Sequence, residues 1–242
     1  MYAFRTTLGP VELAFTDRHG GVSGAPYDEL NLSFSGDDDE HAKAENHRRV
    51  LADFAPGAVL ADLYQVHGND VAVVRGGPPE ERPHCDGVVT AEPGTVLMVR
   101  AADCVPVLLA DPVSGVVGAA HAGRPGVAKG VVPATVARMR ELGAGEATAW
   151  IGPHVCGACY EVPAELQEEV AAVEPATRAT TSWGTPSLDI GAGVRAQLER
   201  EGVTVVDVSR CTRESPDLFS YRRDGPRSGR MAGLITLRGA VS

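Results

Sequence analysis

The chain has 242 residues, which is long enough to bury a large core without help from a disulfide or a metal ion. It carries 22 Lys and Arg against 32 Asp and Glu, and this net charge of −10 argues against a nucleic-acid partner, which requires a basic surface. The longest apolar stretches are interrupted by Arg100, Asp103 and Asp111, so none reaches the roughly 18 residues of a membrane span.

The first part of the chain is predicted to hold one amphipathic helix. Acidic residues at 37–40 are suited to the start of a helix over residues 42–54. The predicted buried side of this helix consists of Ala44, Val50, Leu51 and Phe54.

Strands are predicted to dominate the middle of the chain. Segments 63–66 and 71–74 flank the sequence His-Gly-Asn-Asp, which is typical of a tight hairpin turn. Gly and Pro then indicate an exposed loop over 76–83. Three apolar runs, each bounded by turn residues, predict strands over 95–99, 105–110 and 115–120.

The last part of the chain mixes both kinds of element. Pro suits the first turn of a helix, which predicts helices over 133–142 and 163–173, and a further helix is predicted over 194–201. Late strands are predicted over 203–208, 218–221 and 233–237. No linker interrupts the pattern, so we expect a single domain over residues 1–242, of the α+β or mixed α/β class.

Three segments place a possible metal ligand at the end of a strand. His67 lies where a strand turns, Cys104 lies between two apolar strands, and His121 ends an apolar strand before a Gly-rich loop. Two His and one Cys match the three protein ligands of a catalytic zinc site, which leaves the fourth position to water. The alternative is a buried structural Cys and two hydrogen-bonded His residues, which is the commoner fate of such side chains.

Two further motifs are open to more than one interpretation. Cys156 and Cys159 form a C-x-x-C pair, which is typical of a redox pair or half a zinc site but also of two buried thiols. Residues 191–196 match G-x-G-x-x-A between a possible strand and a helix, in the order of a dinucleotide-binding unit. The short preceding segment and the late position favour a simple helix start instead.

Cations gather in two places in this acidic chain. Arg124 and Lys129 lie in the Gly-rich loop after His121, where they can hold an anion or remain solvated. Residues 221–224 and Arg230 form a second basic cluster, which is either a solvated face or a clamp for phosphate or carboxylate. The motifs of P-loop enzymes, of G-x-S-x-G hydrolases and of H-E-x-x-H proteases are absent from the sequence.

A set of segments, taken in order, resembles the YfiH-like family, described first as laccase-domain or multicopper polyphenol oxidases and later as purine nucleoside phosphorylases. The segments are FTDRHGGVSGAPYDELNL (15–32), GDD…ENHRR (36–49), YQVHGNDV (64–71), CDGVVT (85–90), ADCVPVLLAD (102–111), GAAHAG (118–123), IGPHVCGACYEV (151–162) and CTRESPDLFSYRRDGPRSGRMAGLI (211–235). The resemblance runs nearly from end to end of the chain.

The resemblance implies a single domain of layered α/β/β/α mixed sheets. It also implies that His67, Cys104 and His121 bind one zinc ion. The implied activity is phosphorolysis of adenosine, inosine and 5′-methylthioadenosine, with adenosine deaminase activity beside it. Purine nucleosides and phosphate are therefore the expected partners.

Other site residues are predicted from their chemistry and from the resemblance. Asp103 and Glu161 are candidate acids or bases, and Arg48 is a candidate catalytic cation. Asn46, Arg124 and Arg223 are candidates for binding substrate or phosphate. The chain departs from the family in two places: Arg124 and Pro125 stand where Trp and Arg are usual, and His47 rather than Arg follows Asn46.

Two rival functions remain open at this stage. Two His and one Cys are also the donors of a blue-copper site with a weak axial Met, for which Met98 is the nearest candidate, so copper oxidase activity is an alternative. A structural zinc is the other, with Cys85, His84 or His154 as its fourth ligand. Because the N-terminus lacks an apolar signal segment, we expect a cytoplasmic location with free thiols.

Overall fold

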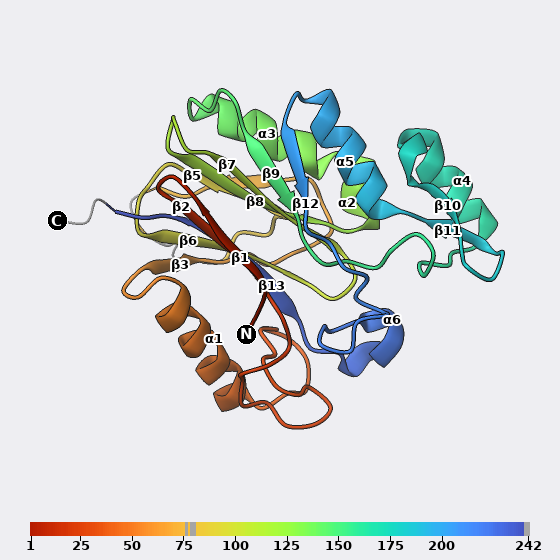
Figure 1. The fold of residues 1–242 in the computed structure, drawn as a ribbon, viewed down its shortest axis with the longest axis horizontal. Coiled ribbons are helices and arrows are strands. Elements are labelled where there is room, and N and C mark those ends of the chain that lie inside the picture. Colours follow the sequence, from red (N-terminus) through yellow and green to blue (C-terminus); the bar gives the residue numbers. More distant parts are fainter. Residues whose placement is uncertain (76, 78–80, 240–242) are drawn as a thin grey trace.

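Two β-sheets lie face to face, and helices cover the outer side of each (Figure 1). The computed structural model describes residues 1–75, 77 and 81–239. Within the predicted loop over 76–83, residues 76 and 78–80 lie outside the described residues. The layers follow the order helix, sheet, sheet, helix, which confirms the predicted mixed-sheet architecture.

The first sheet has five strands in the order β1-β2-β13-β6-β3. Neighbouring strands are antiparallel except for β3 and β6, which run parallel. Helix α1 (Glu40–Phe54) covers its outer face (Figure 1). The strands are β1 (Tyr2–Leu8), β2 (Val11–Thr16), β13 (Met231–Leu237), β6 (Thr95–Ala101) and β3 (Val59–Ala61).

The second sheet has six strands in the order β12-β9-β7-β8-β5-β4. Its central pairs are antiparallel, and β12 and β4 add in parallel at the two edges. The strands are β12 (Thr204–Asp207), β9 (Thr148–Ile151), β7 (Val105–Asp111), β8 (Val116–Ala122), β5 (Gly87–Thr90) and β4 (Val71–Val73).

Helices α2, α3 and α5 pack on the outer face of the six-stranded sheet, and α4 lies beside them with a small hairpin (Figure 1). These elements are α2 (Arg124–Lys129), α3 (Val131–Glu141), α5 (Ile190–Arg200), α4 (Ala164–Val173), β10 (Arg178–Thr180) and β11 (Pro186–Leu188). The short helix α6 (Tyr221–Asp224) follows β12, and 3-10 turns occupy Pro175–Thr177 and Gly225–Arg227.

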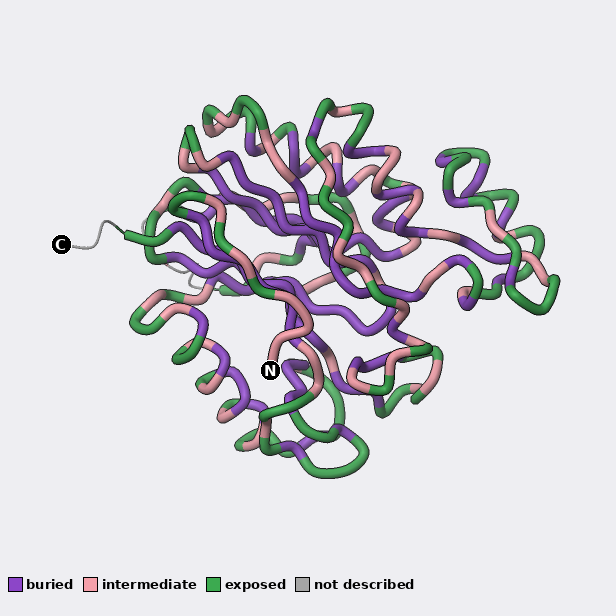
Figure 2. The backbone as a smooth tube through the Cα atoms, in the orientation of Figure 1, coloured by how far each residue is buried: buried purple, intermediate pink, exposed green. Residues whose placement is uncertain are grey.

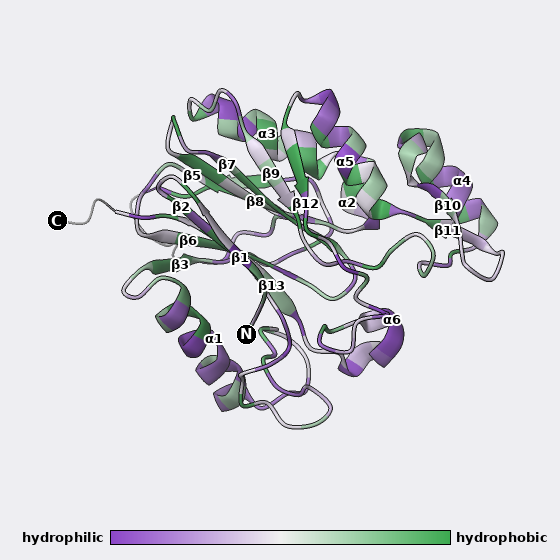
Figure 3. Cartoon of the chain, viewed as in Figure 1, coloured by the Kyte–Doolittle hydropathy of each residue, from purple (hydrophilic) through white to green (hydrophobic). Residues whose placement is uncertain are grey.

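The core follows the two-residue period of the strands. In β7, Val107 and Leu109 face the helices, whereas Leu108 and Ala110 face the other sheet. In β6, Leu97 faces the other sheet and Met98 faces α1. Because both faces of the central strands are covered, these strands are buried along their length and are largely apolar (Figures 2 and 3). This explains why the apolar runs at 95–99, 105–110 and 115–120 predicted strands correctly.

The predicted hairpin over 63–66 and 71–74 is wrong. Segment 71–73 is β4, which pairs in parallel with β5, and segment 63–66 is not a strand. The backbone N–H groups of residues 66–68 donate to the Asp86 carboxylate instead of to a neighbouring strand. A charged acceptor supplied by a distant segment thus replaces the cross-strand partner that the local sequence suggested.

Other predicted elements need smaller corrections. Segment 218–221 is not a strand, since Ser220 caps the helix α6 with its hydroxyl. Residues 124–129 of the predicted Gly-rich loop form helix α2, and β9 was not predicted. The predicted helices over 42–54, 133–142, 163–173 and 194–201 are confirmed with shifted ends, although Ala44 on the first of them is exposed.

The dinucleotide-binding interpretation of residues 191–196 does not fit the topology. Its strand β11 pairs antiparallel with β10 in a two-stranded sheet, apart from the sheet that contains β12. Gly191 and Gly193 lie inside α5, which Asp189 caps through the Ala192 N–H. Gly191 is required by packing, because a Cβ there would lie 2.2 Å from His154 Nε2. These glycines therefore serve helix packing rather than phosphate binding.

Candidate functional site

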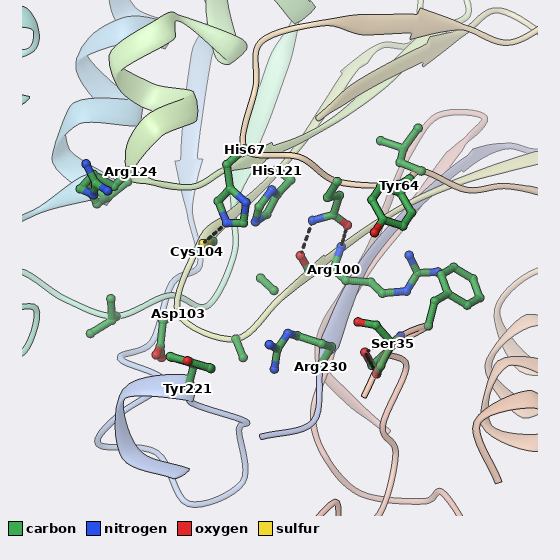
Figure 4. Close-up of a pocket in the computed structure, with 18 of the residues that line it drawn as sticks. Ser35, Tyr64, His67, Arg100, Asp103, Cys104, His121, Arg124, Tyr221 and Arg230 are labelled. Carbon is green, nitrogen blue, oxygen red and sulfur yellow. Dashed lines mark hydrogen bonds between the residues drawn. The ribbon is translucent and has the colours of Figure 1, made fainter. Parts of the chain in front are cut away.

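A cavity of about 620 Å³ lies where the chain crosses from β6 of one sheet to β7 of the other. Its walls come from residues 33–35, 63–65 and 100–104 and from His67, with further side chains from β8, α2 and α6. Figure 4 shows that these side chains converge from both sheets on one space. The crossing between the sheets therefore builds a cavity that is suited to a small ligand.

Three possible metal ligands meet on one side of this cavity. The donor atoms of His67, Cys104 and His121 all lie within 4.8 Å of one another, and Cys104 Sγ is 3.9 Å from His67 Nε2. The pairing of β7 with β8 sets Pro106 opposite His121, which brings the preceding Cys104 to the same strand end. The structure thus gathers all three residues that the sequence proposed as ligands.

Asp86 organises this cluster from behind. Its side chain is fully buried, and Oδ1 lies 2.8 Å from His121 Nδ1, which leaves the Nε2 of that ring for a ligand. The same carboxylate accepts N–H groups from Val66, His67 and Gly68 at 3.1, 3.0 and 2.7 Å. One buried carboxylate therefore orients one imidazole directly and holds the backbone of the other.

The backbone is also shaped for this close approach. His67 and Asp103 have positive φ values of 58° and 92°, which side chains rarely adopt outside sites where the surroundings enforce them. A Cβ at Gly123 would lie 2.6 Å from His67 Cδ2 and 3.1 Å from Cys104 Sγ. Only glycine at position 123 lets the chain pass this close to the imidazole and the sulfur.

Electrostatics favours the charged forms of Cys104, His121 and Asp86. Burial raises the pKa of the Cys104 thiol, but the charge and hydrogen bonds of the two imidazoles outweigh burial and lower this pKa to about 6. Burial lowers the pKa of His121, but Cys104 and Asp86 outweigh it and raise this pKa to about 9. Burial also opposes ionisation of Asp86, yet its hydrogen bonds lower its pKa overall. A thiolate is the form that binds metal ions.

The described residues offer this cluster no fourth protein ligand. Cys85 lies in the core between the sheets, and His84 stacks on Tyr64 at the rim. His154 is buried against Gly191 and contacts the Gly152 carbonyl. A set of three protein ligands beside a cavity is the arrangement of catalytic rather than structural zinc sites.

Three arginines face the cavity without a carboxylate partner among the residues that the structure describes: Arg124, Arg222 and Arg230. Arg222 lies over the ring of Tyr160 at 4.5 Å, and Arg230 donates to the carbonyls of Ser228 and Gly229. Burial lowers the pKa of Arg230, so its charge is incompletely compensated by the protein. By contrast, Arg100 is paired with Asp62 at 2.6 Å. The side of the cavity lined by Arg124, Arg222 and Arg230 is therefore suited to an anion.

Asp103 lies at the cavity, but both of its carboxylate oxygens are occupied. Oδ1 accepts from the Thr212 hydroxyl at 2.5 Å, and Oδ2 accepts from the Arg222 backbone N–H at 2.6 Å. Figure 4 shows the carboxylate beside Tyr221 and away from Cys104. Its geometry is that of a residue that fixes the loop before α6, rather than of an acid or base that reaches a substrate.

Glu161 and Arg48, two other predicted site residues, do not line the cavity. Glu161 is exposed and accepts a hydrogen bond from the Trp183 indole, because the extended backbone there turns Tyr160 inward and Glu161 outward. Arg48 is exposed on α1 and pairs with Glu45.

Arg223, predicted to bind substrate or phosphate, is not among the residues that line the cavity. Its guanidinium donates to the backbone carbonyls of Thr212, Ser215 and Leu218, so it holds a loop together. The neighbouring Arg222 is the one that enters the cavity.

Asn46 and the departure at His47 also have structural explanations. Asn46 is fully buried, and its amide is saturated by Val22, Ser23, Glu29 and Asn31, so it fastens the loop over 22–31 to α1. His47 stacks on Phe34, whose ring is also contacted by Arg82 and by Arg100. At the second departure, Pro125 suits the first turn of α2, which places Arg124 at the start of this helix beside the cavity.

Sequence reasoning missed Asp86, Arg100 and Tyr160 as parts of the site. Asp86 carries one local signal, which is a charged residue directly before the apolar strand β5. The antiparallel pairing of β5 with β8 then sets it beside His121.

Known proteins match this chain over nearly its whole length. The family model described as "Multi-copper polyphenol oxidoreductase laccase" matches residues 12–238. A purine nucleoside phosphorylase of Streptomyces coelicolor is 56% identical over 98% of this chain and 100% of its own length. The Neisseria meningitidis protein NMB0706 has a TM-score of 0.87 at 32% identity, covering 98% and 99% of the two chains. YfiH of Bacillus licheniformis has a TM-score of 0.87 at 28% identity, covering 94% and 93%. Among the described residues, no helix is long and apolar enough to cross a membrane.

Proposed function

The chain belongs to the family of multi-copper polyphenol oxidoreductase laccase proteins, as its YfiH-like motifs predicted, and on this premise we propose that it is a purine nucleoside phosphorylase. Its substrates would be adenosine, inosine and 5′-methylthioadenosine, each cleaved by phosphate to a free base and the corresponding ribose 1-phosphate. Relatives that carry this name support the proposal.

The observation that carries the proposal is the pairing of two features in one cavity. Three arginines without carboxylate partners among the described residues lie beside a cluster of three metal-binding side chains. Arg124 and Arg230 are half-buried and Arg222 is exposed, so an anion bound between them would compensate charges that no described carboxylate pairs. Inorganic phosphate is the anionic co-substrate of phosphorolysis, and guanidinium groups bind it in bidentate fashion.

The arginines would act on phosphate in two ways. Arg124, Arg222 and Arg230 would orient one phosphate oxygen toward C1′ of the ribose and hold the other oxygens. A C–O bond then forms at C1′ as the bond to the purine nitrogen breaks, and the bonding electrons leave with the base, which takes up a proton. Tyr160 stays a neutral hydrogen-bond donor at the cavity wall, because burial raises its pKa.

The residues present fit a zinc ion. Two imidazoles and a thiolate are preferred zinc donors, and Asp86 supplies the carboxylate that commonly orients a ligating histidine. His67, Cys104 and His121 would hold the ion, which supplies Lewis-acid chemistry when bound. We include adenosine deamination in the proposal as a second reaction of the same cavity.

The copper oxidase alternative has less support. Met98, the candidate axial ligand, is fully buried between the five-stranded sheet and α1, away from the cavity. The only other group of possible ligands within the described part of the chain consists of cysteines and a glutamate, not the histidines of a trinuclear copper centre.

The test is incubation of purified, zinc-loaded protein with adenosine, with and without phosphate, followed by chromatography of the products. Phosphorolysis yields adenine and ribose 1-phosphate only when phosphate is present. Deamination yields inosine in both reactions, so the two activities are separated in one experiment. Unchanged adenosine, inosine and 5′-methylthioadenosine with phosphate present would contradict the proposal, and oxidation of phenols by the copper-loaded protein would then favour the alternative.

A further inference from the structure

A second cluster of possible metal ligands lies outside the cavity and plays no part in the proposed reaction. It consists of Cys156, Cys159, Cys211 and Glu214, whose donor atoms all lie within 4.8 Å of one another. Cys159 is buried, Cys156 and Cys211 are half-buried, and Glu214 is exposed. Three of the five cysteines of the chain thus meet at one point, although Cys211 lies more than fifty residues beyond Cys159 in sequence.

Backbone hydrogen bonds place the two contributing segments side by side. The His154 N–H donates to the Arg210 carbonyl at 3.2 Å, and the Thr212 N–H donates to the His154 carbonyl at 3.0 Å. This parallel bridge joins His154 directly to Cys211. The approach of the thiols is therefore fixed by the main chain and needs no bond between the sulfurs.

Each segment then forms a turn that presents two donors. The N–H groups of Cys159 and Tyr160 both donate to the Cys156 carbonyl, at 3.0 Å each. The Ser215 N–H donates to the Cys211 carbonyl at 3.1 Å, so Cys211 and Glu214 share a turn in the same way. C-x-x-C is a usual spacing of zinc ligands, and Cys211 and Glu214 repeat the same spacing on the second turn.

We propose that Cys156, Cys159, Cys211 and Glu214 form a second metal site, which binds Zn²⁺ in a structural role. Three thiolates and one carboxylate complete a four-coordinate shell from protein alone, in contrast to the three-donor cluster at the cavity. A disulfide explains the arrangement less well, because it uses two of the three thiols and gives Glu214 no role.

Cations near the cluster suit the charge of such a shell. Three thiolates and a carboxylate around Zn²⁺ leave an excess of negative charge. Arg213 lies between Thr212 and Glu214 in the chain, and its guanidinium contacts the Cys159 carbonyl at 3.5 Å. Arg223 donates to the carbonyls of Thr212 and Ser215 on the second turn, at 3.0 Å each. Arg213 opposes the excess charge without occupying a ligand position, whereas Arg223, which is already paired with Asp224 at 2.8 Å, serves to hold the second turn.

The site would stabilise one wall of the cavity. Tyr160, which follows Cys159, lines the cavity beneath Arg222. Thr212, which follows Cys211, donates to Asp103 Oδ1 at 2.5 Å. An ion that fixes the two turns therefore also fixes the positions of Tyr160 and Asp103.

Metal content of the full chain tests this inference independently of any enzyme activity. Protein refolded or loaded with Zn²⁺ under reducing conditions and then desalted should hold about two ions per chain, one at each cluster. Cys104→Ala should hold one. The same variant loaded with Co²⁺ should still show intense thiolate-to-cobalt charge-transfer absorption. Because Cys104 is absent from this variant, that absorption has to come from the thiolates of the second cluster.

The Cys104→Ala/Cys211→Ser double variant should lose that absorption, whereas Cys104→Ala/Cys85→Ala, which removes a cysteine outside both clusters, should keep it. If the Cys211→Ser change prevents folding, the spectrum of Cys104→Ala alone decides. Absence of thiolate absorption from folded Cys104→Ala would overturn the site, as would a disulfide between Cys156 and Cys159 found by mass spectrometry in the metal-loaded protein.

Discussion

The two thiol clusters differ in what surrounds their sulfur atoms. Cys104 faces two imidazoles, which lower its pKa to about 6 in spite of burial. Burial and the neighbouring thiols instead raise the pKa of Cys156 to about 12. The surroundings of Cys104 therefore favour its thiolate, whereas those of Cys156 favour the neutral thiol until a cation displaces its proton. The difference separates a site prepared in advance from a site completed by its ion.

The clusters also differ in their access to ligands. His67, Cys104 and His121 supply three donors beside a cavity lined by arginines, which leaves room for a reacting molecule. The second cluster supplies four donors from two turns that are held by backbone hydrogen bonds. Open coordination suits catalysis and closed coordination suits structure, so mutations in the two clusters should have different consequences.

The largest expected effect follows from removing the thiol at the cavity. Cys104→Ala should reduce nucleoside turnover to the uncatalysed background, because one of three ligands is lost. Its thermal unfolding midpoint should change little, since the core is formed by both sheets. Cys211→Ser should behave in the opposite way, with a clear loss of thermal stability and measurable residual turnover. Turnover assays and thermal unfolding of both variants check this contrast, and full activity of Cys104→Ala would contradict it.

The sequence predicted those features of the two clusters and of the surrounding strands that depend on local residue patterns. The apolar runs that became β6, β7 and β8 are buried on both faces, so composition alone identified them. His67, Cys104 and His121 are predicted as ligands because the sequence places each at a predicted strand end or turn, although the strand predicted before His67 is not formed. The family resemblance supplied what spacing could not, because the three positions are far apart in the chain.

Contacts between distant segments were beyond the reach of sequence reasoning. Asp86 replaces the predicted hairpin partner of residues 66–68, and nothing near residue 66 signals this. The choice between Tyr160 and Glu161, or between Arg222 and Arg223, depends on which side of the backbone faces the cavity. Cys211 was not connected to the C-x-x-C pair, because the bridge between His154 and Cys211 is set by the tertiary fold.

The next largest effect concerns the carboxylate that prepares the open cluster. Asp86→Asn keeps the size and shape of the side chain. It replaces one carboxylate oxygen by an NH₂ group, which then faces either the backbone N–H groups or His121. Loss of such a partner typically lowers metal affinity by about 10–100-fold, so zinc titration against a competing chelator should show a decrease in this range. Catalytic turnover at saturating zinc should fall as well, because His67 and His121 lose their orientation.

Asp111 offers a matched control for this change. It is also buried, and it also accepts three backbone N–H groups, from Val113, Ser114 and Gly145. Unlike Asp86, it has no histidine partner among the described residues and lies at the other end of β7 from the cavity. Asp111→Asn should destabilise the fold without changing zinc affinity. Equal losses of zinc affinity in both variants would show that Asp86 acts only through general stability.

A smaller effect should distinguish two adjacent arginines. Arg222→Gln removes a cation from the cavity, and a charge-assisted hydrogen bond contributes about 1.5–3 kcal/mol, so KM for phosphate should rise by about tenfold or more. Arg223→Gln removes donors to three backbone carbonyls, so it should lower the thermal midpoint instead. Phosphate-dependent kinetics and unfolding curves separate the two, and an unchanged KM in Arg222→Gln would remove this residue from the proposed phosphate site.

The smallest expected effect is a dependence of stability on pH at Asp111. Burial opposes its ionisation, but the N–H groups of Gly145, Ser114 and Val113 outweigh burial and lower its pKa in the folded state. A carboxyl group with a lowered pKa stabilises the fold above its unfolded pKa, and this contribution is lost as the pH falls through the folded value. Asp111→Asn should therefore unfold about 2–4 °C below the wild type at pH 7, as expected for a loss of about 1 kcal/mol in a chain of this size. The difference should shrink as the pH falls below about 4, which thermal unfolding across this range will measure. A difference that stays constant with pH would mean that the amide disturbs packing, and the contrast between Asp86 and Asp111 would then have to be tested with Ala variants.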